Sequence, residues 1–186
     1  KIVVELKDSL MDNTTYTIDF SDAISDNNEG NPMGNYTYSF STGERIDTFE
    51  VSGNVLDATN LEPIKGILVG LYDDLSDTVF ARKPFIRVSR TDSRGRFVIR
   101  GIAPGTYRVY ALQDADGNYI YSQKSEMLAF SHETFNPYAK PDIRQDTVWR
   151  DTLRIDSIMR TPYTHFYPDD LVLRAFTALQ TDRYLV

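Results

Sequence analysis

The sequence has no cysteine, few basic residues and no long apolar run, and each absence excludes a class of protein. Without cysteine the chain cannot form disulfides, use a thiolate nucleophile or hold zinc through sulfur. Its 20 Lys and Arg stand against 27 Asp and Glu, a net charge of −7, whereas nucleic-acid binding needs clustered positive charge to displace counterions. No stretch of about 18 apolar residues is present. We therefore expect neither a nucleic-acid partner nor a membrane span in this chain.

Sequence motifs of catalysis are missing as well. The chain contains no HExxH zinc motif, no GxSxG nucleophile elbow and no glycine-rich phosphate loop. Its two histidines, His132 and His165, lie beside aromatic residues, and neither has a nucleophile or a second metal ligand at a telling spacing. We predict that both histidines pack against their neighbours and that the chain is not an enzyme.

What the sequence does contain is a series of short alternating segments separated by Gly, Pro and Asp, which is typical of β-strands and turns. Alternation predicts strands at 2–6, 15–20 and 36–40. Farther along, the segment from Thr91 to Gly95 predicts a hairpin turn, and Pro104 with Gly105 predicts a type II turn. With 41% hydrophobic residues, the chain can fill the core of one large or two small β-domains.

The first part of the chain resembles a known family. The stretch LMDNTTYTIDFSDAISDNNEGNPMGNYTYSFSTG is similar to the second half of a bacterial immunoglobulin-like domain of the type found in surface-layer proteins. The resemblance implies that the first half of this sandwich precedes Lys1 and that the chain is a fragment. Unpaired strand edges in such a half-domain invite strand donation or dimerisation, so we expect self-association.

The middle of the chain resembles a second family. The segments VSGNVLDATNLEPIKGILVGLYD and SRTDSRGRFVIRGIAPGTYRVYALQD are similar to the carboxypeptidase regulatory-like family over residues 48–122. This implies an all-β fold, a Greek-key β-sandwich of the transthyretin type, preceded by the partial Ig-like unit, and no catalytic role. The expected domains are 1–46, the partial Ig-like unit, 47–133, the sandwich, and 134–186, a linker or extended arm and the start of a further unit.

One group of residues has the chemistry of a cation site. Asp114, Asp116 and Asn118 alternate along the chain and Glu126 follows, and such oxygen ligands can surround Ca²⁺. The sixth and twelfth positions of an EF-hand loop counted from Asp114 hold tyrosine and serine rather than Gly and Glu. The favoured interpretation is an Asp-Gly-Asn turn leading to a strand at 119–121, with a structural Ca²⁺ as the alternative and no other cofactor.

The last third of the chain has a different character. FNPYAKPDIRQ has two prolines and no periodicity and predicts a linker or a strapping segment, and the repeated acidic residues that follow it predict an extended strand or arm. Leu171–Phe176 is predicted as a strand, with a helix over 170–180 as the alternative. Trp149 and Tyr163 are not explained by strand alternation, so they are the candidate residues for stacking on a sugar.

These observations favour a non-catalytic structural or spacer module over an enzyme. By resemblance, the parent is an exported bacterial cell-surface protein, an outer-membrane lipoprotein or a periplasmic protein, and the partners of this chain are neighbouring domains. The alternative is a β-sandwich module that binds a carbohydrate or a surface protein. Fold alone does not decide between them.

Overall fold

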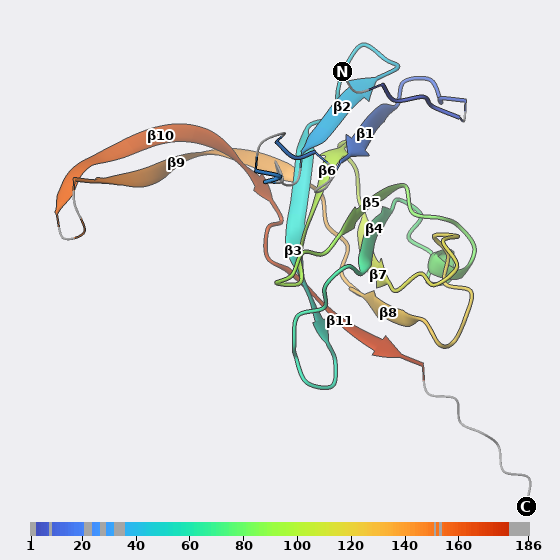
Figure 1. The fold of residues 1–186 in the computed structure, drawn as a ribbon. Helices are drawn as coiled ribbons and strands as arrows, with labels where there is room; N and C mark the ends of the chain where they lie inside the picture. Colours follow the sequence, from blue (N-terminus) through green and yellow to red (C-terminus); the bar gives the residue numbers. More distant parts are fainter. Residues whose placement is uncertain are drawn as a thin grey trace, which may run out of the picture. The chain divides into compact units, whose positions relative to one another are not determined.

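The computed structural model describes residues 3–7, 9–20, 24–26, 29–31, 36–150, 152 and 154–178. These residues form β-strands and one short 3₁₀ helix, so the predicted all-β class is confirmed (Figure 1). The chain divides into two compact units. The first contains residues 1–48 with 100–103, and the second contains residues 49–99 and 104–186.

The first unit is built on an antiparallel pair of strands, β1 (Thr15–Asp19) and β2 (Thr37–Ser41). Both strands lie where alternation predicted them. Tyr16 pairs with Phe40, and their rings stack with centroids 5.5 Å apart. The strand predicted at 2–6 is wrong for the described residues 3–6, which are not in a regular element.

A seven-stranded sheet has the order β5-β4-β7-β8-β11-β3-β6 and belongs to the second unit, except for residues 100–102 at the end of β6, which are part of the first. One strand, β11, connects its two halves: Leu171 to Ala175 pair in parallel with β3, and Phe176 and Thr177 then pair antiparallel with β8. The sheet thereby divides into two layers of a sandwich that share β11. The strands are β3 (Phe49–Asp57), β4 (Leu68–Tyr72), β5 (Arg87–Arg90), β6 (Arg96–Ile102), β7 (Arg108–Leu112), β8 (Met127–Phe130) and β11 (Leu171–Thr177).

The layer with β4 and β7 is buried on both faces. All five residues of β4 are buried, because one face packs inside the sandwich and the other is covered by loops. Tyr72, Tyr110 and Leu112 form a cluster on the covered face with Val79 of the 3₁₀ helix Val79–Ala81. This cluster holds the loops after β4 and β7 against the sheet.

A long hairpin leaves the sheet of the second unit (Figure 1). It consists of β9 (Tyr138–Trp149) and β10 (Ile155–Tyr167), paired antiparallel along their length. Almost all residues of β9 are exposed. We call residues 138–167 the arm. Its base contacts β3, where the rings of Phe166 and Phe49 meet edge to face at 6.5 Å.

Several predictions for the later part of the chain are corrected. The linker or strapping segment predicted over 135–145 is wrong from Tyr138 onward, because those residues form β9 and pair with β10. The strand predicted at 171–176 is confirmed as β11, but it completes the second unit instead of starting a further one. Residues 119–121 are irregular rather than a strand, and the chain returns to the sheet only at Met127.

The predicted turns differ in detail from those observed. Gly95 has the expected positive φ of 70° and Asp92 accepts the N–H of Arg94, yet β5 and β6 lie at opposite ends of the sheet and do not form a hairpin. Gly105 does not have the positive φ of a type II turn. A Cβ at Gly105 would lie 3.1 Å from the Tyr107 hydroxyl, so the absence of a side chain lets that ring pack there.

Candidate functional site

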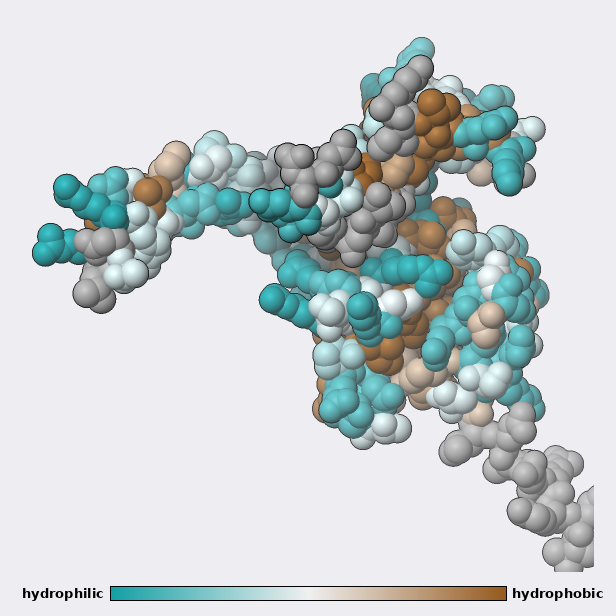
Figure 2. All heavy atoms as spheres, viewed as in Figure 1, coloured by the Kyte–Doolittle hydropathy of each residue, from teal (hydrophilic) through white to brown (hydrophobic). Residues whose placement is uncertain are grey.

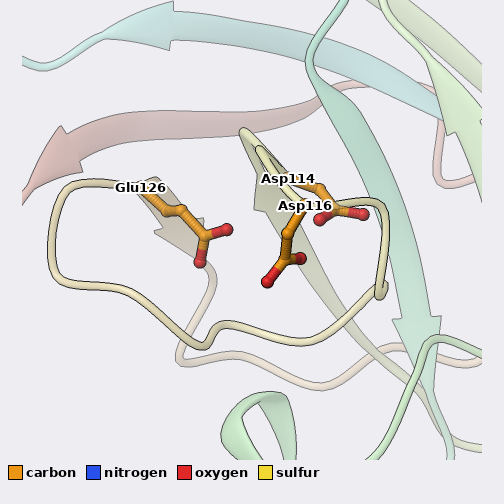
Figure 3. Close-up of side chains that lie close together, drawn as sticks. All are labelled: Asp114, Asp116 and Glu126. Atoms are coloured by element: carbon orange, nitrogen blue, oxygen red, sulfur yellow. The ribbon is translucent and has the colours of Figure 1, made fainter.

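The acidic residues singled out in the sequence lie in the loop 113–126, between β7 and β8. Gly117 allows the tight turn in this loop because it has a φ of 76°. The structure brings the carboxylates of Asp114, Asp116 and Glu126 together, with oxygens within 4.8 Å of one another. In Figure 3, Asp116 and Glu126 face each other across the loop and Asp114 lies beside Asp116.

The two aspartates are acceptors for the turn itself. Asp114 accepts the backbone N–H groups of Gly117 at 2.9 Å and Tyr119 at 2.9 Å. Asp116 accepts the Ser122 hydroxyl at 3.0 Å and the Asn118 side-chain amide at 2.8 Å. Partial desolvation raises the pKa of Asp116, but the hydrogen bonds of the loop, led by those from Ser122 and Asn118, together outweigh it and leave this pKa below its ordinary value. Both side chains therefore order the loop by accepting its hydrogen bonds.

Glu126 ties the two ends of the loop together. It is only 2% exposed, and its two oxygens accept the backbone N–H groups of Ala115 at 3.2 Å, Ser122 at 3.0 Å and Gln123 at 3.1 Å. A buried carboxylate is costly unless donors surround it, and these three bonds supply them. The loop thus has at its centre a side chain that accepts three backbone hydrogen bonds.

Three of the four predicted calcium ligands have suitable positions, and the fourth does not. Asp114, Asp116 and Glu126 offer hard oxygen atoms at a common point. Asn118 instead uses its oxygen to accept the Ile120 N–H at 2.7 Å and its amide to bind Asp116. The calcium hypothesis therefore rests on three carboxylates that already accept hydrogen bonds from the loop.

The predicted ligand residues Trp149 and Tyr163 are not brought together. Trp149 lies at the far end of β9 and is 59% exposed, whereas Tyr163 pairs with Asp142 nearer the base of the arm. Trp149 and Asp142, the cross-strand partner of Tyr163, are seven positions apart on β9. At about 3.3 Å per position, the distance between them is roughly 23 Å. The alternation of side chains also places the two rings on opposite faces of the arm.

Tyr163 belongs instead to a polar network at the base of the arm. Its hydroxyl donates to Asp142 Oδ2 at 3.0 Å and lies 2.9 Å from Nδ1 of His165. Nε2 of His165 lies 2.8 Å from Asp169 in the turn after β10. The hydrogen bond with Asp169 is the main cause that raises the pKa of His165, and Asp142 adds to it. When both ring nitrogens donate, the imidazolium links β9, β10 and the turn.

Aromatic rings on the same face of the arm cover one another. His165 stacks on Tyr167 at 4.4 Å, and Tyr167 stacks on Tyr138 at 5.0 Å. The ammonium of Lys140 lies 5.2 Å from the centre of the Tyr138 ring and 5.8 Å from that of Tyr167. As predicted, both histidines pack on aromatic neighbours, since His132 contacts Phe130 at 5.0 Å. Most ring faces here are thus used within the arm.

This network was not predicted from the sequence. Asp142 and His165 are 23 positions apart, and only the pairing of β9 with β10 brings them within 3.4 Å. A signal was present in the alternation of Tyr163, His165 and Tyr167, which lie on one face of a strand. Recognising β9 as its partner would have completed the network.

Comparison with known proteins gives one family match, over the beginning of the chain. A family model described as a bacterial Ig-like domain matches residues 1–42, which agrees with the resemblance in the sequence. No curated protein matches the chain. A solved structure, the T6 backbone pilin of serotype M6 Streptococcus pyogenes, described as a modular three-domain protein, is 14% identical with a TM-score of 0.30.

The alignment with the pilin covers 79% of this chain and 36% of the pilin, so the chain spans about a third of that protein. At this TM-score the similarity says nothing of what the chain does. Among the described residues, no helix has the length and apolar character needed to cross a membrane. The resemblance of residues 48–122 to the carboxypeptidase regulatory-like family stays a prediction, and two of the seven strands observed, β8 and β11, come from outside that range.

Proposed function

We propose that this chain is a non-catalytic structural module of an exported bacterial cell-surface protein. The match of residues 1–42 to a bacterial Ig-like domain carries the proposal. It is supported by the division of the chain into two compact β-units, which suits a module that spaces or presents neighbouring domains.

The chemistry of the charged clusters supports a structural role. Asp114, Asp116 and Glu126 accept hydrogen bonds from their own loop, and His165 is held between two carboxylates. Groups fixed in this way order the backbone.

Surface exposure of the parent protein tests the proposal. In the bacterium that encodes it, antibody raised against this chain should bind intact cells, and external protease should remove the epitope. A cytoplasmic protein of the same cells serves as the control and should stay protected. Protection of the epitope in intact cells, together with its recovery in the cytoplasmic fraction, would overturn the proposal.

A carbohydrate- or protein-binding module is the second candidate, and the exposure of Trp149 favours it. A glycan array probed with and without Ca²⁺ tests it. Specific binding that Trp149→Ala abolishes and Met159→Ala leaves intact would establish recognition. Equal loss in both variants, or no binding in either condition, would favour the structural role alone.

A further inference from the structure

The arm contains a short sequence that occurs three times. An aspartate, then a threonine or serine, then an aliphatic residue are found at 146–148, 151–153 and 156–158. The copies follow one another at intervals of five residues, whereas side chains on a strand return to the same face every two residues. A spacing of five therefore does not arise from one buried or one covered face of a strand.

The structure places the copies in different surroundings. Copy 146–148 lies inside β9 and is paired throughout. Copy 156–158 begins at a register shift in β10, so that Asp156 has no partner on β9. In copy 151–153, Thr152 lies between the two strands, and its neighbours are outside the described residues. A common role in packing therefore does not account for the repeat.

The hydroxyl groups of the two fully described copies lie on opposite faces of the arm. Ser157 pairs with Val148, and cross-strand partners point to the same face. Thr147 precedes Val148 on β9, so its side chain points to the other face. A partner that covered one face of the arm would contact only one of these hydroxyls. What the copies share is their sequence, which an enzyme that binds a short stretch of chain recognises.

The hydroxyl groups of the repeat are exposed and unused. Thr147, Thr152 and Ser157 are exposed, and no described residue forms a hydrogen bond with any of the three hydroxyls. Elsewhere in the chain, hydroxyls order the fold: those of Thr42 and Thr91 donate to backbone carbonyls at 2.7 Å. The hydroxyls of the repeat have no such structural role.

The same order of residues elsewhere in the chain serves the fold. Residues 77–79 have it, but Val79 is 0% exposed and packs in a core cluster, and a copy at 8–10 lies partly outside the described residues. In the arm, by contrast, Val148 is 39% exposed and Ile158 is 57% exposed. Figure 2 shows the arm with mostly teal and white side chains and a few brown ones. On the arm, then, the whole tripeptide is open to an enzyme.

The neighbouring carboxylate selects the group that each hydroxyl accepts. A phosphate would add a charge of about −1.5 to −2 beside Asp146 or Asp156, and like charges repel. A neutral sugar meets no such repulsion. Sugars are also bulky and solubilising, which suits exposed strands that carry apolar side chains. The chemistry of the repeat therefore favours a sugar over a phosphate.

We propose that the hydroxyls of the two fully described copies, Thr147 and Ser157, are acceptors for O-linked sugars. The transferase recognises an aspartate, a hydroxyl residue and an aliphatic residue in succession on the exposed arm. Its co-substrate is a glycosyl phosphate, a sugar whose anomeric carbon is bonded to a phosphate oxygen. This inference goes beyond the proposed structural role and does not rest on it.

The transfer is a substitution at the anomeric carbon. The hydroxyl oxygen of Thr147 or Ser157 forms a bond to that carbon, and the bond from the carbon to the phosphate oxygen breaks. The phosphate leaves with the electron pair of the broken bond, and the hydroxyl proton passes to a base of the transferase. Nothing is oxidised or reduced.

Mass spectrometry of tryptic peptides tests the proposal on the parent protein isolated from the bacterium that encodes it. Cleavage after arginine gives the peptides 145–150 and 155–160, in which Thr147 and Ser157 are the only hydroxyl residues. Each peptide should carry the added mass of one or more sugars. The same protein from a host without O-glycosylation is the control and should give both peptides at their unmodified masses.

Two reciprocal variants test the role of the aspartate. Asp146→Asn should abolish the modification of Thr147 and leave Ser157 modified. Asp156→Asn should do the reverse, so each variant is the matched control for the other. Circular dichroism checks that both variants are folded.

Two other threonines serve as internal controls. Thr161 is exposed on the arm but follows an arginine. Thr78 follows an aspartate but precedes the buried Val79. Both should stay unmodified in the native protein.

Several outcomes would overturn the proposal. Peptides 145–150 and 155–160 that are unmodified in the native protein, or that carry phosphate instead of sugar, would do so. The same holds for sugars that persist in both aspartate variants, and for a sugar on Thr161 or Thr78.

Discussion

At the scale of single residues, Glu126 is the one acidic side chain that is buried among the described residues. Glu126→Gln replaces an acceptor of three backbone N–H groups with a side chain that has only one acceptor oxygen. We expect a loss of about 1 to 3 kcal/mol in the free energy of unfolding, measured by urea denaturation. Glu133→Gln, at an exposed position, is the control and should change little. Equal effects of the two substitutions would contradict the role of Glu126.

His165 makes stability depend on pH. Its pKa is raised in the folded state, first by the hydrogen bond with Asp169 and further by Asp142, and Lys140 is its cross-strand partner on β9. Its contribution is therefore fully present below the ordinary histidine pKa of about 6.5 and is lost as pH rises through the higher folded pKa. The difference in unfolding free energy between wild type and His165→Gln should be larger near pH 6 than near pH 9. A difference independent of pH would refute this.

At the scale of elements, β11 holds the sandwich together. Leu173 is 1% exposed, whereas Val172 next to it is 55% exposed. Leu173→Ala should cost about 2 to 5 kcal/mol, and Val172→Ala should cost less than about 1 kcal/mol. Thermal and urea unfolding measure both. Similar small losses would mean that residues 171–177 are not part of the core.

The loop 113–126 should not need a metal ion. Its carboxylates already accept hydrogen bonds from the loop, so we expect millimolar Ca²⁺ to leave the melting temperature unchanged. A ligand that binds only the folded state must raise it. A rise that saturates with Ca²⁺ and disappears in Asp116→Asn would instead establish a structural calcium site. Mg²⁺ controls for ionic strength.

Elements with strong local signals could be predicted from the sequence. β1 and β2 lie where alternation placed them, since a period of two marks a strand with one buried face. β11 lies where the turn signal at 168–170 and the β-preference of Val172 placed it. β9 could not be predicted, because Pro141 interrupts it and its exposed residues give no apolar period. The burial of β4 on both faces depends on the loops that cover it. The sequence does not reveal such covering.

The same distinction applies to the candidate sites. Asp114, Asp116 and Glu126 could be grouped from the sequence because they share one short loop. The contacts of His165 with Asp142 and Asp169 depend on the register of β9 and β10. That register became visible only with the fold, because strand pairing is not local in sequence.

At the scale of the whole molecule, the arm should be separable from the sandwich. Asp142 pairs with Tyr163, so a two-residue Asn-Gly turn can replace residues 143–162. Most of the removed side chains are exposed, and we expect the melting temperature to change by less than about 4 °C. Differential scanning calorimetry measures it. Loss of the folded transition would show that the arm supports the sandwich.

The parallel pairing of β3 and β11 determines how the second unit responds to tension. β3 begins this unit, β11 lies near its end, and five residue pairs join the two strands in register from Gly53–Leu171 to Asp57–Ala175. A pull applied before β3 and after β11 slides the strands past each other. Their hydrogen bonds then bear the load together instead of opening one at a time. We therefore expect the unit to resist rupture by such a pull, and single-molecule stretching would measure the force at which it opens.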